Sequence, residues 1–194
     1  MNQHTCTVKR VALFAALFAV SGLAIASANM LRNGSFETQG ADGEFTARSW
    51  KMNDPDEHGE AWGSATRQTW RAHEGTSIGT IRGTWAKAGD FGGWWQEAEA
   101  TVGMIYRVTA QFYADANWKA STQELKLEFW NADRSRMLGA VTNAFHDVGE
   151  TWTEKSVDGT APIGTVWVRA AINVSGAGEA GALQIDEVDL DLAL

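Results

Sequence analysis

The feature that most restricts the fold is a strict alternation of apolar and polar side chains over residues 125–130, Leu-Lys-Leu-Glu-Phe-Trp. Successive side chains of a β-strand point to opposite faces, so Leu125, Leu127 and Phe129 share one face. The two charged side chains and Trp130 share the other face. The pattern therefore predicts a strand with one face in an apolar core and the other face turned outward.

The same alternation returns elsewhere and predicts an all-β protein. Residues 106–114 and 165–174 alternate apolar side chains with polar or aromatic ones. Turn signals separate about eight to ten such short segments, and we find no convincing amphipathic helix. We therefore expect an antiparallel β-sandwich, formed by one domain over residues 29–194.

Residues 1–28 have the pattern of a secretory signal peptide. Lys9 and Arg10 precede an apolar run over residues 11–25, and Ala26-Ser-Ala28 forms a small-residue cleavage site. The alternative is an uncleaved membrane anchor, but the apolar run is short for a membrane span. The sequence thus predicts a secreted protein, extracellular or periplasmic, with no membrane insertion after cleavage.

Charge and cysteine content restrict the partners and the source of stability. The sequence has 16 Lys and Arg against 24 Asp and Glu, and loss of Lys9 and Arg10 leaves 14 against 24, a balance of −10. This excess of acid argues against nucleic acid or an anionic membrane as a partner. The only cysteine, Cys6, lies in the predicted leader. The mature chain must therefore be held by its core or by a metal rather than by a disulfide.

The ten Trp residues are the outstanding feature of the composition. Trp130 faces outward with Glu128, and Gln111 and Tyr113 are outward by the same alternation. The apolar face of a sugar ring stacks on indole, while its hydroxyl groups take charged or amide partners. These four side chains therefore predict a site for a polysaccharide or oligosaccharide.

Other side chains are expected to extend this site. Trp94 and Trp95 must face opposite ways on a strand, and we expect Trp94 outward and Trp95 buried. For each Trp taken singly, the alternative is packing against the sandwich, which we expect for Trp50 and Trp152. The predicted ligand-binding residues are Trp130, Glu128, Gln111, Tyr113, Trp94, Trp167, Arg169, Trp85 and Trp118.

The order of motifs along the chain resembles that of a known superfamily. The motifs are Leu31-x-Asn-Gly-Ser-Phe-Glu, Gly75-x-Ser-Ile, Trp95-Gln, Gly103-x-x-Tyr, Leu125-x-Leu-x-Phe, Trp152 with Ala161-Pro, and Leu183-x-Ile-Asp-Glu-Val. Together they resemble the carbohydrate-binding modules of families 4, 9 and 22, which are galactose-binding-like jelly rolls. Such modules are usually attached to a glycoside hydrolase, and the absence of one here is a departure from that pattern, which leaves open whether a separate carbohydrate-active enzyme is a partner.

The resemblance also implies a structural calcium ion. The positions that match the ligands of these modules are the carbonyl groups of Ser35 and Gly75 and the carboxylates of Glu37 and Asp186. Calcium accepts such a mixture of oxygen ligands, and it would tie the first strand to the last. The alternative is that both carboxylates are ordinary residues at strand ends.

No catalytic constellation can be assembled from the sequence. The G-x-G-x-x-G pattern over residues 176–181 precedes a strand rather than a helix, so we expect a hairpin loop. His58, His73 and His146 lack the spacing of a zinc site. We therefore expect a non-catalytic carbohydrate-binding domain. The alternatives are a structural or adhesive interaction domain of the same fold, and a small jelly-roll lyase or hydrolase.

Overall fold

The computed structural model describes residues 28–50 and 59–193. The predicted leader, apart from Ala28, lies outside these ranges, as do His58 and most of the acidic loop that precedes β3. No helix within the two described ranges is long and apolar enough to cross a membrane.

The described chain forms two five-stranded sheets and one two-stranded sheet, and all strand pairs are antiparallel. The strands are β1 (Gln39–Gly40), β2 (Gly43–Ala47), β3 (Gly59–Gly63), β4 (Ala65–Gln68), β5 (Ile78–Arg82), β6 (Gly92–Glu99), β7 (Ile105–Ala114), β8 (Thr122–Trp130), β9 (Met137–Ala144), β10 (Thr153–Thr160), β11 (Trp167–Ser175) and β12 (Ala182–Leu192), with a 3-10 turn η1 (Thr84–Ala86) after β5.

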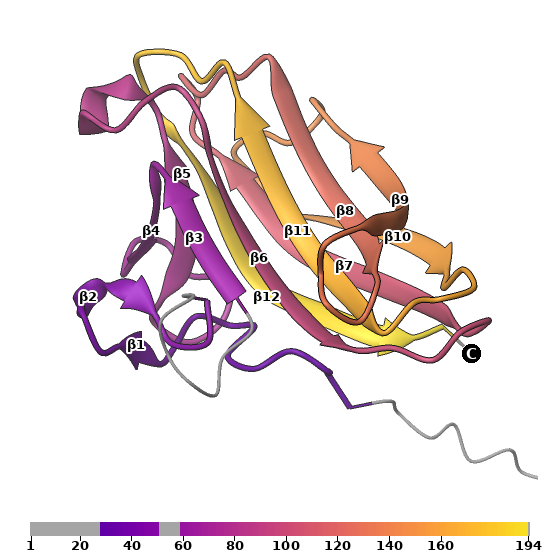
Figure 1. Ribbon diagram of the computed structural model, residues 1–194. Helices are drawn as coiled ribbons and strands as arrows, with labels where there is room; N and C mark the ends of the chain where they lie inside the picture. Colours follow the sequence, from indigo (N-terminus) through magenta and orange to yellow (C-terminus); the bar gives the residue numbers. More distant parts are fainter. Residues whose placement is uncertain (1–27, 51–58, 194) are drawn as a thin grey trace, which may run out of the picture.

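The two larger sheets pack face to face, as Figure 1 shows. The first sheet has the strand order β10-β7-β12-β5-β4, and the second has the order β3-β6-β11-β8-β9. The small β1–β2 sheet lies beside β4. The antiparallel β-sandwich jelly roll expected from the sequence is therefore confirmed.

The core follows the alternation seen in the sequence. Leu125, Leu127 and Phe129 of β8 are buried, and on the next strand the aliphatic side chains of β11 point the same way. The facing sheet contributes the inward side chains of β7 and β12. Each large side chain buried in this way stabilises the fold by roughly 1.5–3 kcal/mol, so the two sheets are held by their apolar inner faces.

An aromatic cluster closes one end of the core. The ring of Phe36 stacks on Trp50 with ring centroids 5.1 Å apart, and its edge meets Trp94 at 5.2 Å. Trp50 also donates its indole N–H to the carbonyl of Asn33 at 2.9 Å. The core position predicted for Trp50 is confirmed, whereas the outward position predicted for Trp94 is wrong, because that side chain is only 1% exposed.

The prediction failed at Trp94 because a polar residue lies on the inner face of β6. Trp94 and Gln96 share that face, and both are buried. The amide of Gln96 accepts the backbone N–H of Arg32 at 2.6 Å and donates to the Arg32 carbonyl at 2.9 Å. A buried amide is stable when its hydrogen bonds are made, so this contact to the N-terminal segment sets the register and turns Trp95 outward.

We predict that Leu127→Ala lowers the free energy of unfolding by about 2–5 kcal/mol, because it leaves a cavity in a fully buried site of a central strand. The measurement is urea unfolding followed by Trp fluorescence. Ile163→Ala is the control, since Ile163 is 90% exposed, and it should change the free energy by less than about 0.5 kcal/mol. Equal effects of the two changes would contradict the assignment of the core.

Candidate functional site

A shallow groove lies on the outward face of the second sheet. It has a volume of about 340 Å³ and is lined by Glu60, Trp62, Trp95, Glu128, Trp130, Arg169, Ala171 and Asn173. These residues come from β3, β6, β8 and β11, four adjacent strands of one sheet. Three of the eight are half-buried indoles, so the groove offers flat apolar surfaces and polar groups at the same place.

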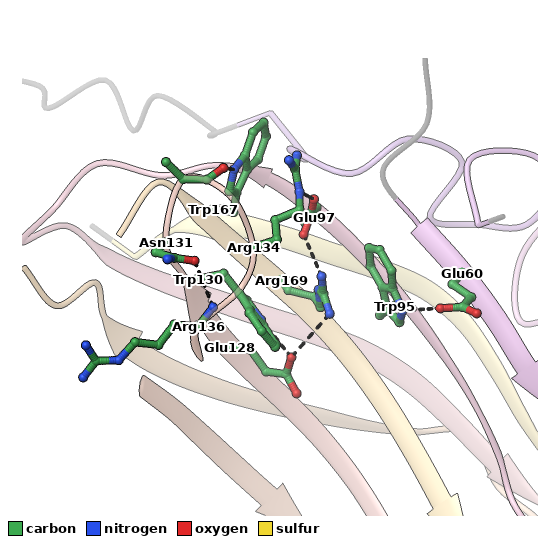
Figure 2. A network of polar contacts seen from close by, with 11 residues as sticks. Glu60, Trp95, Glu97, Glu128, Trp130, Asn131, Arg134, Arg136, Trp167 and Arg169 are labelled. Atoms are coloured by element: carbon green, nitrogen blue, oxygen red, sulfur yellow. Dashed lines mark hydrogen bonds and ion pairs between the residues drawn. The ribbon is translucent and has the colours of Figure 1, made fainter. Parts of the chain in front are cut away.

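Arg169 lies at the centre of this face, between two indole rings. Its guanidinium carbon is 3.7 Å from the ring centroid of Trp95 and 4.7 Å from that of Trp130. One nitrogen, Nη2, donates to the Glu97 carboxylate at 2.9 Å, and Nη1 is 3.9 Å from the carboxylate of Glu128 (Figure 2). Cross-strand pairing explains the arrangement, because Arg169 lies opposite Glu97 on one side and Glu128 on the other.

Glu97 joins two arginines in one network. Its side chain is only 1% exposed, and it accepts hydrogen bonds from Arg169 and from Nε of Arg134. The guanidinium of Arg134 in turn covers the ring of Trp167 at 3.8 Å. A buried carboxylate needs paired charges and hydrogen bonds to be tolerated, so this network fixes both arginines relative to the sheet.

The indole N–H groups hold their rings in place. Trp95 donates to Glu60 at 3.2 Å, and Trp130 donates to Glu128 at 3.0 Å. Trp167 donates to the carbonyl of Ala132 at 3.1 Å. Aromatic rings fixed in this way lose little freedom when a ligand stacks on them, which favours binding.

Small residues leave room beside the rings. A Cβ atom on Gly93 would lie 2.1 Å from the Trp62 ring, so only glycine lets this indole lie across β6. Ala171 lies opposite Trp95 on the neighbouring strand and keeps the floor of the groove low. Sequence reasoning did not select Trp62 for the site, because only the pairing of β3 with β6 brings it over Gly93.

The structure separates the group on which the predicted site was centred. Trp130 and Glu128 lie on β8 of the second sheet, whereas Gln111 and Tyr113 lie on β7 of the first sheet. The outward faces of the two sheets are on opposite sides of the sandwich, so these four side chains do not form one site. Trp167 and Arg169 do share a face with Trp130, as expected.

Gln111 and Tyr113 have other surroundings. Gln111 lines a separate polar groove and donates to Glu154 at 3.5 Å. Tyr113 is buried beneath the guanidinium of Arg71, 4.4 Å from its ring centroid, and beside Trp152. Trp152 is only half-buried and lies outside the core cluster, so the core position predicted for it is wrong.

Two further aromatic residues of the predicted site lie away from the groove. Trp85, in η1, is half-exposed and stacks on Trp70 with ring centroids 6.3 Å apart. Trp118 is 8% exposed, because its indole N–H donates to the buried amide of Gln123 at 2.8 Å. A loop position in the sequence therefore did not make this side chain accessible.

Three of the four residues expected to hold calcium meet at one turn, residues 73–77. The Glu37 carboxylate accepts the backbone N–H groups of Thr76 and Ser77 at 2.9 and 2.8 Å, and Asp186 accepts those of His73 and Glu74 at 2.9 and 3.1 Å. A Cβ on Gly75 would lie 2.5 Å from the Glu37 carboxylate. Both carboxylates therefore already accept hydrogen bonds from backbone N–H groups of the turn, and in this way they hold the turn directly.

The electrostatics of these two carboxylates differ. Burial raises the pKa of Asp186 to about 6, against the opposing effect of the N–H groups of Glu74, Glu187 and His73. Burial also acts to raise the pKa of Glu37, but the hydrogen bonds from Thr76 and Ser77 outweigh it and lower that pKa.

The predicted calcium set has only two carboxylates, and both already accept backbone N–H groups. No group of three or more His, Cys, Asp or Glu side chains that could hold one occurs within residues 28–50 and 59–193. Ser35, the fourth predicted ligand, lines the polar groove on the first sheet instead. Calcium binding stays a prediction from the resemblance, and the arrangement of these residues does not favour it.

No protein-family model and no curated protein matches this chain. Among solved structures, a CBM4 structure superposes with a TM-score of 0.54 at 17% identity, covering 84% of this chain and 99% of that one. The module TmCBM61, solved in complex with β-1,4-galactotriose, gives 0.53 at 17% identity and covers 86% and 100%.

A third similar structure is enzymatic. The enzymatically active domain of tailspike protein 4 of bacteriophage CBA120 gives a TM-score of 0.60 at 14% identity. The match covers 85% of this chain but spans only 21% of the tailspike chain. At such identities the likeness concerns the fold alone. The chain therefore has the β-sandwich jelly-roll fold of carbohydrate-binding modules.

Proposed function

We propose that this protein binds a polysaccharide or oligosaccharide in the groove of the second sheet, without catalysing a reaction. The observation that carries the proposal is the meeting of three half-buried indoles, from Trp62, Trp95 and Trp130, with carboxylate and amide groups in one groove. Binding of galactotriose by the similarly folded TmCBM61 supports a sugar as the ligand.

The chemistry of the groove suits a sugar ring. The C–H face of a pyranose stacks on indole, and its hydroxyl groups donate to carboxylates such as Glu60 and Glu128. Asn173 adds an amide that can both donate and accept. Because Arg169 already fills the space between Trp95 and Trp130, a sugar would stack on the open sides of these rings rather than between them.

The non-catalytic role and the location are parts of the same proposal. The carboxylates of Glu60 and Glu128 each accept an indole N–H, which fits a role in holding rings and hydroxyl groups. The predicted leader supports export.

We predict that Trp95→Ala and Trp62→Ala each weaken glycan binding about 10-fold or more, since a loss of 1.4 kcal/mol of stacking corresponds to a factor of ten. The measurement is affinity electrophoresis in gels containing galactan, xylan or mixed-linkage glucan, followed by calorimetry. Trp70→Ala is the matched control, because Trp70 is an exposed indole away from the groove, and it should bind normally.

Two results would count against this proposal. The first is retention by none of the glycans, combined with a concentration-dependent dimer, which would favour the adhesive alternative. The second is release of reducing ends from a glycan that stops on replacement of Glu60 or Glu128, which would make the protein an enzyme.

We also predict that Arg169→Lys weakens glycan binding about tenfold while the protein stays folded. Lysine keeps the positive charge near Glu97 but cannot stack a planar group between Trp95 and Trp130, so both rings become less fixed. Calorimetry gives the affinity and near-ultraviolet circular dichroism reports the order of the rings. Unchanged affinity would show that Arg169 does not organise the groove.

A further inference from the structure

A buried guanidinium lies where the N-terminal segment meets the first sheet. Arg67, on β4, is 8% exposed. Its Nε donates to the carbonyl of Phe36 at 2.7 Å, and Nη1 donates to the carbonyl of Glu44 at 3.0 Å. Nη2 donates to the carbonyl of Glu37 at 3.1 Å and to Oγ of Ser77 at 2.5 Å. All three nitrogen atoms are therefore used, with four oxygen acceptors.

These acceptors come from three separate parts of the chain. Phe36 and Glu37 belong to the N-terminal segment, Glu44 belongs to β2, and Ser77 directly precedes β5. The acceptors are three backbone carbonyl oxygens and one hydroxyl oxygen, all of them neutral. Oxygen atoms of this kind also serve as ligands of hard cations such as calcium, together with carboxylates. In this chain the cation among them is a side chain.

The carboxylate of Glu37 makes a second set of hydrogen bonds between the N-terminal segment and the turn before β5. It accepts the backbone N–H groups of Thr76 and Ser77 and the hydroxyl of Thr76 at 2.9 Å. Arg67 reaches the same turn through Ser77 and the same N-terminal segment through its carbonyls. Arg67 and Glu37 together therefore join the start of the chain to the turn before β5 by direct hydrogen bonds.

From this geometry we infer that Arg67 and Glu37, through direct hydrogen bonds, hold the N-terminal segment on the turn before β5, so that the chain folds without calcium. The inference concerns stability and does not depend on the proposed sugar site. A guanidinium suits this task because its five N–H groups spread in a plane toward several acceptors, whereas an ammonium is a compact point charge.

The test is the melting temperature of the mature protein in excess EDTA and in excess calcium chloride, with no sugar present. A structural ion at 100 times its dissociation constant would raise the melting temperature by roughly 5–10 °C. We expect no difference between the two conditions. A rise of that size with calcium would overturn the inference, whatever the protein does with glycans.

Substitution tests the arginine itself. Arg67→Lys and Arg67→Met should each lower the melting temperature by several degrees, because buried carbonyls then lose their donors. Arg107→Met is the control, since the Arg107 side chain is 52% exposed and pairs with Asp158 at the surface. A melting temperature for Arg67→Met equal to that of the control would overturn the inference. If Arg67→Met does not fold, Arg67→Lys and the EDTA comparison still decide.

Discussion

Burial of alternate side chains between the two sheets is the constraint on which the rest of this structure depends. On β8 and β11 the aliphatic side chains fill the interior, and this forces the residues between them outward onto one face. Trp130, Glu128 and Arg169 lie together there only because their neighbours are core residues. The candidate binding face is therefore a direct consequence of core packing, and a shift of one residue in register would bury it.

Electrostatic pairing then gives that face its rigidity. The buried carboxylate of Glu97 holds Arg169 and Arg134, and each guanidinium covers an indole. Glu97 on β6, by holding these two arginines, thus fixes the positions of the rings that they cover. The carboxylates of Glu60 and Glu128 fix two of these rings further, because each accepts an indole N–H. The fold alone does not decide between binding and catalysis.

Direct hydrogen bonds from side chains also join the N-terminal segment to the sandwich. Gln96 binds the backbone of Arg32, and Arg67 binds carbonyls of Phe36 and Glu37. Without a cysteine among residues 28–194, the start of the chain is held by polar side chains that reach its backbone. These contacts are buried or partly buried, where a hydrogen bond is costly to lose.

The sequence by itself determined the all-β sandwich, the inward faces of β8 and β11, and the outward position of Trp130, because a strand has a period of two and apolar alternation shows which face is buried. It could not determine which strands are neighbours, since pairing joins residues far apart in the chain. Gln111 and Tyr113 therefore seemed to belong with Trp130, although they lie on the other sheet. Only the tertiary structure brought Trp62 over Gly93, turned Trp95 outward through the contact of Gln96 with Arg32, and surrounded Arg67 with oxygen atoms from three segments. Each of these depends on long-range hydrogen bonds or strand register, which local patterning does not encode.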